Sequence, residues 1–179
     1  EDYRDIIEMA EAHLKYGTTS IVPTTLAAPV EQLKKVTLSI KKASEEIRTS
    51  TILGIHYEGP YISKKYKGAQ SEQNILNPVK CPPDELFDLW DKVLIMGAAP
   101  EEEGVLALGD KLKERGIVGS VAHSAASYEQ VEEAVKHDFY SAECDIQLTK
   151  DNKWVVIHNA EVDDRFCQFG KIADLTLEE

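Results

Sequence analysis

The segment Ile55 to Pro60 reads IHYEGP and holds two side chains that can bind a metal or transfer a proton. His56 and Glu58 are two residues apart, so in a strand both side chains point to the same face. Gly59 and Pro60 follow directly and end the strand, which leaves Glu58 at its rim. A carboxylate at such a rim can hold a divalent metal, and a bound metal acidifies water.

A second candidate ligand, His123, stands in VAHSAA near the end of a later predicted strand. A carboxylate and an imidazole that converge across the mouth of a barrel form half of a Zn²⁺-type ligand set. We therefore predict that Glu58 and His123 bind a metal. The alternative is that Glu58 caps its strand and that His123 is a hydrogen-bonded core histidine. Spacing alone does not choose between the two.

A second group of candidates lies in SAECDIQL, where Glu143 and Asp145 are again two residues apart on a predicted strand. Two carboxylates on one face suit a hard cation such as Mg²⁺ or Ca²⁺. His158 ends the next predicted strand, where an imidazole can serve as a general acid or base. The alternative is that the two carboxylates form the polar face of an exposed strand.

Helical and strand-like patterns alternate along the chain. The predicted helices cover 6–14, 33–47, 84–91, 102–115 and 128–137. The predicted strands cover 18–26, 51–60, 93–101, 117–126, 139–149 and 153–161. Successive strand–helix units imply a parallel sheet with right-handed crossovers, and polar strand ends suit a barrel. The predicted fold class is α/β, a partial (β/α) TIM-type barrel of about five to six strands, because a closed barrel needs about 250 residues.

The overall charge excludes some partners. The formal net charge is −12, which argues against nucleic acid because phosphate binding needs clustered Lys and Arg. No apolar run approaches the roughly 20 residues of a membrane helix, so no membrane partner is expected. The acidic N-terminus is unlike a leader peptide, and the three cysteines show no metal-binding spacing and read as reduced thiols. The expected location is the cytoplasm.

Five segments occur in an order that resembles one known family. They are GTTSIVPTTL, ILGIHYEGPYIS, KGAQ, AAPE and AHSAASYEQVEEAV. Together they resemble N-acetylglucosamine-6-phosphate deacetylases of the amidohydrolase superfamily, over about residues 1–136. The resemblance implies that Glu58 and His123 are metal ligands, and that Gly68, Ala69 and Gln70 belong to a substrate-side loop, with His56 also facing the substrate. It implies a metal-activated water that attacks the acetamide of a small phosphorylated sugar. The family's further metal histidine and its general-base aspartate have no counterpart here.

Residues 139–179 resemble a different barrel family, the glycerophosphodiester phosphodiesterases. The shared features are an E-x-D strand followed by LTKD, VV-x-H, Asp164-Arg165 and ADLTLEE. This resemblance implies that Glu143 and Asp145 bind a divalent cation and that His158 is one of two catalytic histidines. His123 takes the place of the other, although Ser124 stands where that family has an arginine.

We interpret the chain as a hybrid of two barrel families, with deacetylase-like strand–helix units over 1–136 and a phosphodiesterase-like segment over 137–179, packed as one domain. The first functional hypothesis is a metal-dependent deacetylase, and the second is a phosphodiesterase. Little or no turnover is expected of either, because both sites lack groups that their families have. The third is an inactive barrel fragment that associates with another copy through the open edges of its sheet.

Overall fold

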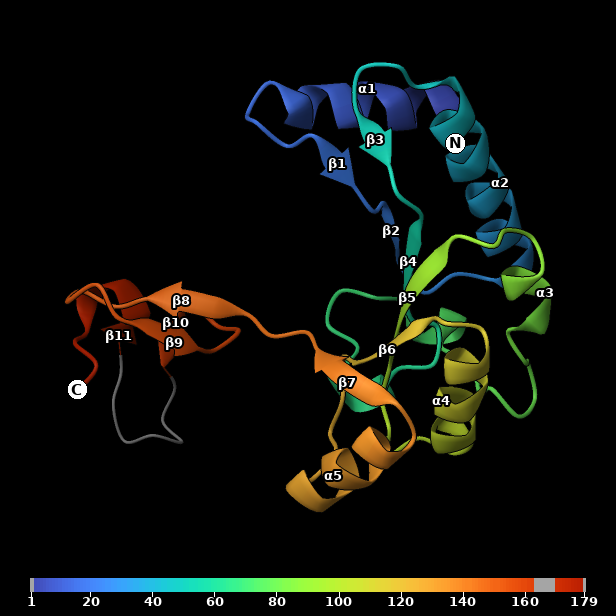
Figure 1. Ribbon diagram of the computed structural model, residues 1–179. Helices are drawn as coiled ribbons and strands as arrows, with labels where there is room; N and C mark the ends of the chain where they lie inside the picture. Colours follow the sequence, from blue (N-terminus) through green and yellow to red (C-terminus); the bar gives the residue numbers. More distant parts are fainter. Residues whose placement is uncertain (1, 163–169, 179) are drawn as a thin grey trace. The chain divides into compact units, whose positions relative to one another are not determined.

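The computed structural model describes residues 2–162 and 170–178. The chain divides into two compact units, Glu1–Ala142 and Glu143–Glu179. In Figure 1 the first unit runs from blue to orange and the second from orange to red. This division follows contacts in the structure and does not test the family boundary near residue 136, which stays a prediction.

Five parallel strands form the sheet of the first unit, in the order β2-β4-β5-β6-β7 (Figure 1). Their bounds are Thr24–Thr25, Ile55–Glu58, Val93–Ala98, Val118–Val121 and Phe139–Ala142. Helix α1 (Tyr3–Leu14) precedes the sheet, and the helices between its strands are α2 (Val30–Glu46), α3 (Asp84–Phe87), α4 (Val105–Glu114) and α5 (Tyr128–Lys136). This open parallel sheet with helical crossovers confirms the predicted α/β fold of partial TIM type.

The strand predicted over 18–26 and the one predicted over 51–60 are each interrupted once. Short strands β1 (Ser20–Ile21) and β3 (Thr51–Ile52) pair in parallel ahead of β2 and β4. The ladder continues across the gap, because the amide of Leu53 donates to Ile21 O and that of His56 to Pro23 O, each at 3.0 Å. Pro23 has no N–H to donate, which accounts for the break in its own strand.

The apolar core of the first unit forms because each helix buries one stripe. In α2 the buried residues are Leu33, Thr37, Ile40 and Ala43, at steps of three and four that place them on one helical face. Thr37 and Tyr57, from α2 and β4, have no exposed surface and are joined by a short hydrogen bond of 2.5 Å between their hydroxyl groups. The contact ties the helix to the strand that carries Glu58.

The long segment between β4 and α3 has little regular structure, as its composition predicts. It contains two single-turn 3₁₀ helices, η1 (Lys64–Tyr66) and η2 (Glu72–Asn74), and it begins with a cis peptide bond between Gly59 and Pro60. Within residues 2–162 and 170–178, no helix is both long and apolar enough to span a membrane. Cys81 and Cys144 are free thiols, while Cys167 lies outside the described residues.

The second unit consists of two small antiparallel pairs and a 3₁₀ turn. Its elements are β8 (Ile146–Leu148), β9 (Trp154–Val156), β10 (Glu161–Val162), β11 (Gly170–Lys171) and η4 (Ile172–Asp174), with β8 paired to β9 and β10 to β11. The hydroxyl of Thr149 donates to Asp151 Oδ1 at 2.6 Å, and Asn152 has a positive φ of 59°. These contacts make the turn that folds β8 back on β9.

The single strand predicted over 139–149 is wrong in its middle. The chain leaves the parallel sheet at Ala142, has no strand structure over 143–145, and enters the antiparallel hairpin at Ile146. The turn at 150–152 causes the difference, because it commits 146–148 to pair with the strand that follows. The next predicted strand is also too long, since β9 ends at Val156 and His158 lies in a bend.

Candidate metal centre

Glu58 and His123 meet across an intervening strand. Glu58 is the last residue of β4, and His123 lies two residues beyond the end of β6, while β5 runs between these two strands. Gly97 of β5 pairs with Glu58, and a Cβ on Gly97 would lie only 3.1 Å from the Cβ of Ala122. A glycine there leaves room for side chains from both neighbours, so the carboxyl ends of β4 and β6 share one space.

The carboxylate of Glu58 and the ring of His123 are in direct contact. Glu58 Oε1 lies 2.7 Å from His123 Nε2, and the two side chains are 24% and 21% exposed. On its other side, His123 Nδ1 lies 2.9 Å from the carbonyl oxygen of Tyr66. A carbonyl can only accept, so Nδ1 carries a proton and donates it. The Nε2 atom therefore either donates to Glu58 as part of an imidazolium or presents a lone pair to a cation.

This arrangement is the one that metal-binding histidines use. Such a histidine donates one ring N–H to a carbonyl or carboxylate, which fixes the tautomer and aims the other nitrogen at the metal. The backbone strengthens the arrangement, because the amide of Ser63 donates to His123 O at 3.0 Å. His123 itself has a φ of 46°, an unfavourable conformation for a residue with a Cβ. The surrounding loop thus holds His123 in place against a local backbone preference.

The substrate-side residues predicted in KGAQ lie near this pair. Gly68 and Ala69 are exposed, and a Cβ on Gly68 would approach His123 Cε1 to 3.3 Å. Gln70 is buried and donates from Nε2 to Glu58 Oε1 at 2.8 Å. The loop therefore contacts both candidate ligands, and Gln70 does so through its side chain.

His56 shares the face of Glu58, as its spacing predicts. Its Nδ1 lies 3.3 Å from Thr24 Oγ1, and its buried Nε2 has no hydrogen-bond partner among the described residues. Burial lowers the pKa of His56, with the charge of Glu58 acting in the opposite direction as the smaller effect. His56 is accordingly a neutral imidazole at pH 7.

Glu101, the last residue of AAPE, contacts the segment that follows His123, which its sequence pattern does not indicate. Its Oε2 accepts from Ser124 Oγ at 2.6 Å, and its Oε1 accepts from the amide of Ala125. These bonds fix the turn that directly follows His123. The role is hard to foresee, because one of the two groups that Glu101 binds is a backbone amide.

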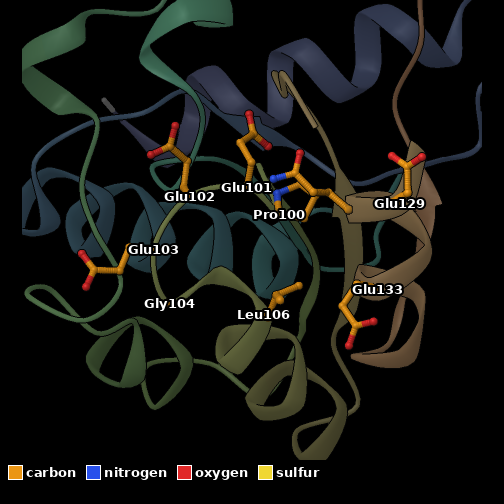
Figure 2. Close-up of a pocket in the computed structure, with 9 residues that line it drawn as sticks. Pro100, Glu101, Glu102, Glu103, Gly104, Leu106, Glu129 and Glu133 are labelled. Carbon is orange, nitrogen blue, oxygen red and sulfur yellow. The ribbon is translucent and has the colours of Figure 1, made fainter. Parts of the chain in front are cut away.

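The acidic pocket beside Glu101 is a separate feature. Its volume is about 430 Å³, and Figure 2 shows Glu101, Glu102, Glu103, Glu129 and Glu133 around it. The other lining residues are Pro100, Gly104, Leu106 and Gln130. Glu58 and His123 are not among them, so this pocket is not the candidate metal centre.

The second group of predicted site residues lies in the other unit, and two of the expectations about it need correction. Glu143 and Asp145 are exposed and stand in the segment between β7 and β8, so they do not share the face of one strand. His158 is exposed, with Nδ1 2.8 Å from Asn159 Oδ1, and follows β9 by two residues. Asp145 O accepts from the amide of Ile157 at 3.0 Å, which places Asp145 and His158 near each other across the hairpin. Asp164-Arg165 lies outside the described residues.

Glu58 and His123 are the candidate ligands to test against the donor set of a metal site. No group of three or more His, Cys, Asp or Glu residues that could hold a metal occurs in 2–162 or 170–178. Glu58 and His123 offer one oxygen and one nitrogen, and a catalytic zinc site has three protein ligands. The pair fits such a metal in donor type and in orientation, as two ligands of the set.

Comparison with known proteins connects the two parts of the chain to two families. The model of the glycerophosphoryl diester phosphodiesterase family matches residues 115–179. The N-acetylglucosamine-6-phosphate deacetylase of Lysinibacillus sphaericus is 32% identical over 129 residues, which cover 69% of this chain and 32% of that protein. The human deacetylase is also 32% identical, over 71% of this chain and 32% of its own length. The chain is similar to both families.

Solved structures point in the same direction. The deacetylase from Thermotoga maritima has 34% sequence identity and a TM-score of 0.63, over 73% of this chain and 35% of that one. The one from Pasteurella multocida has 25% identity and a TM-score of 0.71, over 96% of this chain and 42% of that one. The chain spans about a third of the length of the curated deacetylases it matches. The phosphodiesterase family model begins at residue 115, and the match to the Lysinibacillus sphaericus deacetylase covers 69% of the chain. The two matches therefore share some residues.

Proposed function

We propose that this chain carries part of the active site of a metal-dependent deacetylase that hydrolyses the acetamide of an amino-sugar phosphate. The observation that carries the proposal is the contact between Glu58 Oε1 and His123 Nε2 at the carboxyl ends of two parallel strands. Sites in barrels of this kind lie at that end of the sheet. The similarity to deacetylases supports the choice of substrate, since a variant of the Mycobacterium smegmatis enzyme has been solved in complex with N-acetyl-D-glucosamine-6-phosphate.

In this proposal each residue has a defined task. Glu58 and His123 hold a divalent metal, Zn²⁺ by donor type, and the carbonyl of Tyr66 keeps the proton of His123 on Nδ1. A bound metal would polarise the acetamide carbonyl and acidify the water that attacks it. His56, a neutral imidazole on the same face, and the exposed Gly68 and Ala69 lie on the substrate side. The C–N bond breaks to give acetate and the free amine.

The test is acetate release from N-acetylglucosamine 6-phosphate by the purified chain with Zn²⁺ present. We expect Zn²⁺ bound by the wild-type chain, and acetate release that is weak and stops when a chelator is added. If neither acetate nor bound Zn²⁺ is found, the deacetylase proposal is wrong for this chain. The chain spans about a third of the length of its relatives, so metal binding and catalysis can be lost separately. Bound Zn²⁺ without acetate release would support the metal centre and contradict the deacetylase activity.

A second candidate function is supported by the family match over 115–179. It is a phosphodiesterase that binds Mg²⁺ or Ca²⁺ through Glu143 and Asp145 and uses His123 and His158 as acid and base. Release of glycerol 3-phosphate from a glycerophosphodiester, stimulated by Mg²⁺ or Ca²⁺, would support it. Turnover that a His158→Ala substitution leaves unchanged would count against it.

A third possibility is a cytoplasmic fragment without activity that pairs with a second copy. In the described part of the first unit, β2 and β7 are the outer strands of the five-stranded sheet, and outer strands have unpaired backbone groups. Sedimentation velocity over a hundredfold range of concentration would show the association. A constant monomeric mass would contradict this possibility, and so would efficient turnover of either substrate.

A further inference from the structure

Gln70 is the most buried polar residue around the candidate metal centre. Its side chain is 3% exposed although it lies on the irregular segment between η1 and η2. Its own backbone is tied to Lys67, because the amide of Gln70 donates to Lys67 O at 3.0 Å and Lys67 Nζ donates to Gln70 O at 3.2 Å. A buried amide in such a position is costly unless both of its ends are hydrogen-bonded.

Both ends are hydrogen-bonded, and the partners fix which way the amide faces. The backbone N–H of Ala27 can only donate, and it lies 2.6 Å from Gln70 Oε1. The carboxylate oxygen of Glu58 can only accept, and it lies 2.8 Å from Gln70 Nε2. The reverse orientation would set two donors against each other at Ala27 and two acceptors at Glu58. The amide therefore has one orientation.

The anchor at Ala27 is itself held on both sides. Asn74 Nδ2 donates to Ala27 O at 3.1 Å, so the same segment binds the N–H of Ala27 through Gln70 and its carbonyl through Asn74. The side-chain bond of Asn74 goes to Ala27 and not to Glu58 or His123. Two side chains of one loop thus make equivalent anchors, and only one of them reaches on to the metal centre.

We propose that Gln70 is a positioning residue that holds Glu58 Oε1 against His123 and fixes the carboxylate for metal binding. The inference deepens the proposed function and rests on it, since Glu58 is a metal ligand only there. It also assigns Gln70 a different task from the predicted substrate contact, because its amide oxygen bonds Ala27 and its amide nitrogen bonds Glu58. Partners of this kind that orient a ligand typically change metal affinity by about 10- to 100-fold when they are removed.

The test compares Gln70→Met with Asn74→Ala in the full chain. Methionine fills a similar volume without hydrogen bonding, so it removes both contacts of the amide. The alanine substitution removes the other anchor at Ala27 and leaves Glu58 untouched. Zn²⁺ binding is measured by isothermal titration calorimetry, with circular dichroism melts to show that each variant is folded. We expect Gln70→Met to weaken Zn²⁺ binding by about 10- to 100-fold and Asn74→Ala to change it by less than about threefold.

Each outcome decides the matter. Equal Zn²⁺ affinity in Gln70→Met and wild type would overturn the inference while leaving the proposed function intact, and so would an equal loss in both variants. If the wild-type chain binds no Zn²⁺, the proposed function fails, and the positioning role of Gln70 is then tested by a crystal structure of Gln70→Met. A Glu58 carboxylate that stays within hydrogen-bond distance of His123 in that variant would overturn the positioning role. A Glu58 carboxylate that has moved away from His123 would support it.

A second variant covers the case in which Gln70→Met does not fold. Gln70→Asn keeps a buried amide but is one methylene shorter, so it cannot bond Ala27 and Glu58 at once. We expect it to fold and to lose at least about tenfold in Zn²⁺ affinity. Affinity equal to that of the wild type would overturn the inference.

Discussion

The contact between Glu58 and His123 contributes little to the free energy of folding. Both side chains are about a fifth to a quarter exposed, and ion pairs with that much access to water contribute about 0–1 kcal/mol to stability. The same pair brings a carboxylate oxygen within 2.7 Å of an imidazole nitrogen at these strand ends. A substitution at Glu58 should therefore separate binding from stability.

We predict that Glu58→Gln lowers Zn²⁺ affinity by about 100-fold or more, because losing a ligand should cost at least as much as losing a residue that orients one. The free energy of unfolding in urea should change by less than about 1 kcal/mol. Glu72→Gln is the control, since Glu72 is an exposed carboxylate of the same loop whose nearest cation is Lys64 at 3.6 Å. Unchanged Zn²⁺ affinity in Glu58→Gln would show that metal, if bound, is bound elsewhere.

Tyr57, beside Glu58 in β4, makes the stability of the first unit sensitive to alkaline pH. Burial raises the pKa of Tyr57 from 10.0 to about 12, and the hydrogen bond with Thr37 opposes the shift only in part. The folded chain therefore keeps this proton over a range in which the unfolded chain loses it. Stability that is complete below pH 10 is lost as the pH rises toward 12.

We expect the free energy of unfolding to fall between pH 10 and 12, at up to about 1.4 kcal/mol per pH unit for one such group. Burial also raises the pKa of Tyr61. The Tyr57→Phe variant should accordingly show a shallower slope that is not zero. Urea unfolding at several pH values measures both slopes. Parallel curves for wild type and variant above pH 10 would contradict the assignment to Tyr57.

At the scale of the helices and strands, packing reverses one expectation from helix propensity. Gly109 lies inside α4, where alanine is normally better than glycine by about 1 kcal/mol. A Cβ there would collide with the carbonyl oxygen of His137 and lie 2.8 Å from a ring carbon of Phe139. Phe139 is 1% exposed and belongs to β7, so neither group can move away easily.

We predict that Gly109→Ala destabilises the chain by about 1–3 kcal/mol, the usual cost of overpacking, in spite of the better helix propensity. Glu114→Ala, at an exposed position of the same helix, should stay within about 0.5 kcal/mol of the wild type. Chemical denaturation followed by circular dichroism gives both values. A stabilised Gly109→Ala variant would show that the approach of α4 to β7 is looser than described.

Much of this architecture could be predicted because the periodicity of apolar residues reports directly on burial. The face of α2 that contains Leu33 and Ile40 is buried as its spacing predicts. The meeting of Glu58 with His123 also follows from the sequence, because parallel strands end at one edge of the sheet. The break at 143–145 does not, since nothing local separates a strand that continues from one that turns into a hairpin.

The contacts that support the site were harder to predict for a different reason. Tyr66 acts through its carbonyl oxygen, which every residue has, so its type carries no information. Glu101 binds the amide of Ala125, and Gln70 binds that of Ala27, each across a long stretch of sequence. The residues that bear charge and chemistry could be selected from the sequence. Their backbone partners required the structure.

Across the whole chain, the buried apolar residues are distributed very unevenly. Every member of the main hydrophobic cluster lies between Ala10 and Phe139, within the first unit. Among the described residues of the second unit, Ile172 is the one buried hydrophobic residue. The paired positions Ile146–Val156 and Leu148–Trp154 of its hairpin are all exposed. Units of fewer than about 40 residues usually need disulfides, metals or association to be stable.

We therefore expect the two units of the chain to open with very different free energies. Native-state hydrogen exchange followed by NMR should show the amides of β4, β5 and β6 protected at least about a thousandfold more strongly than those of β8 and β9. A thousandfold difference corresponds to about 4 kcal/mol in the free energy of opening, since each factor of ten is about 1.4 kcal/mol. The comparison is internal, so one sample serves as its own control. Equal protection would mean that the hairpin opens only when the parallel sheet does, and that its apolar residues are covered in solution. Strong protection that weakens on dilution would assign that cover to a second copy of the chain.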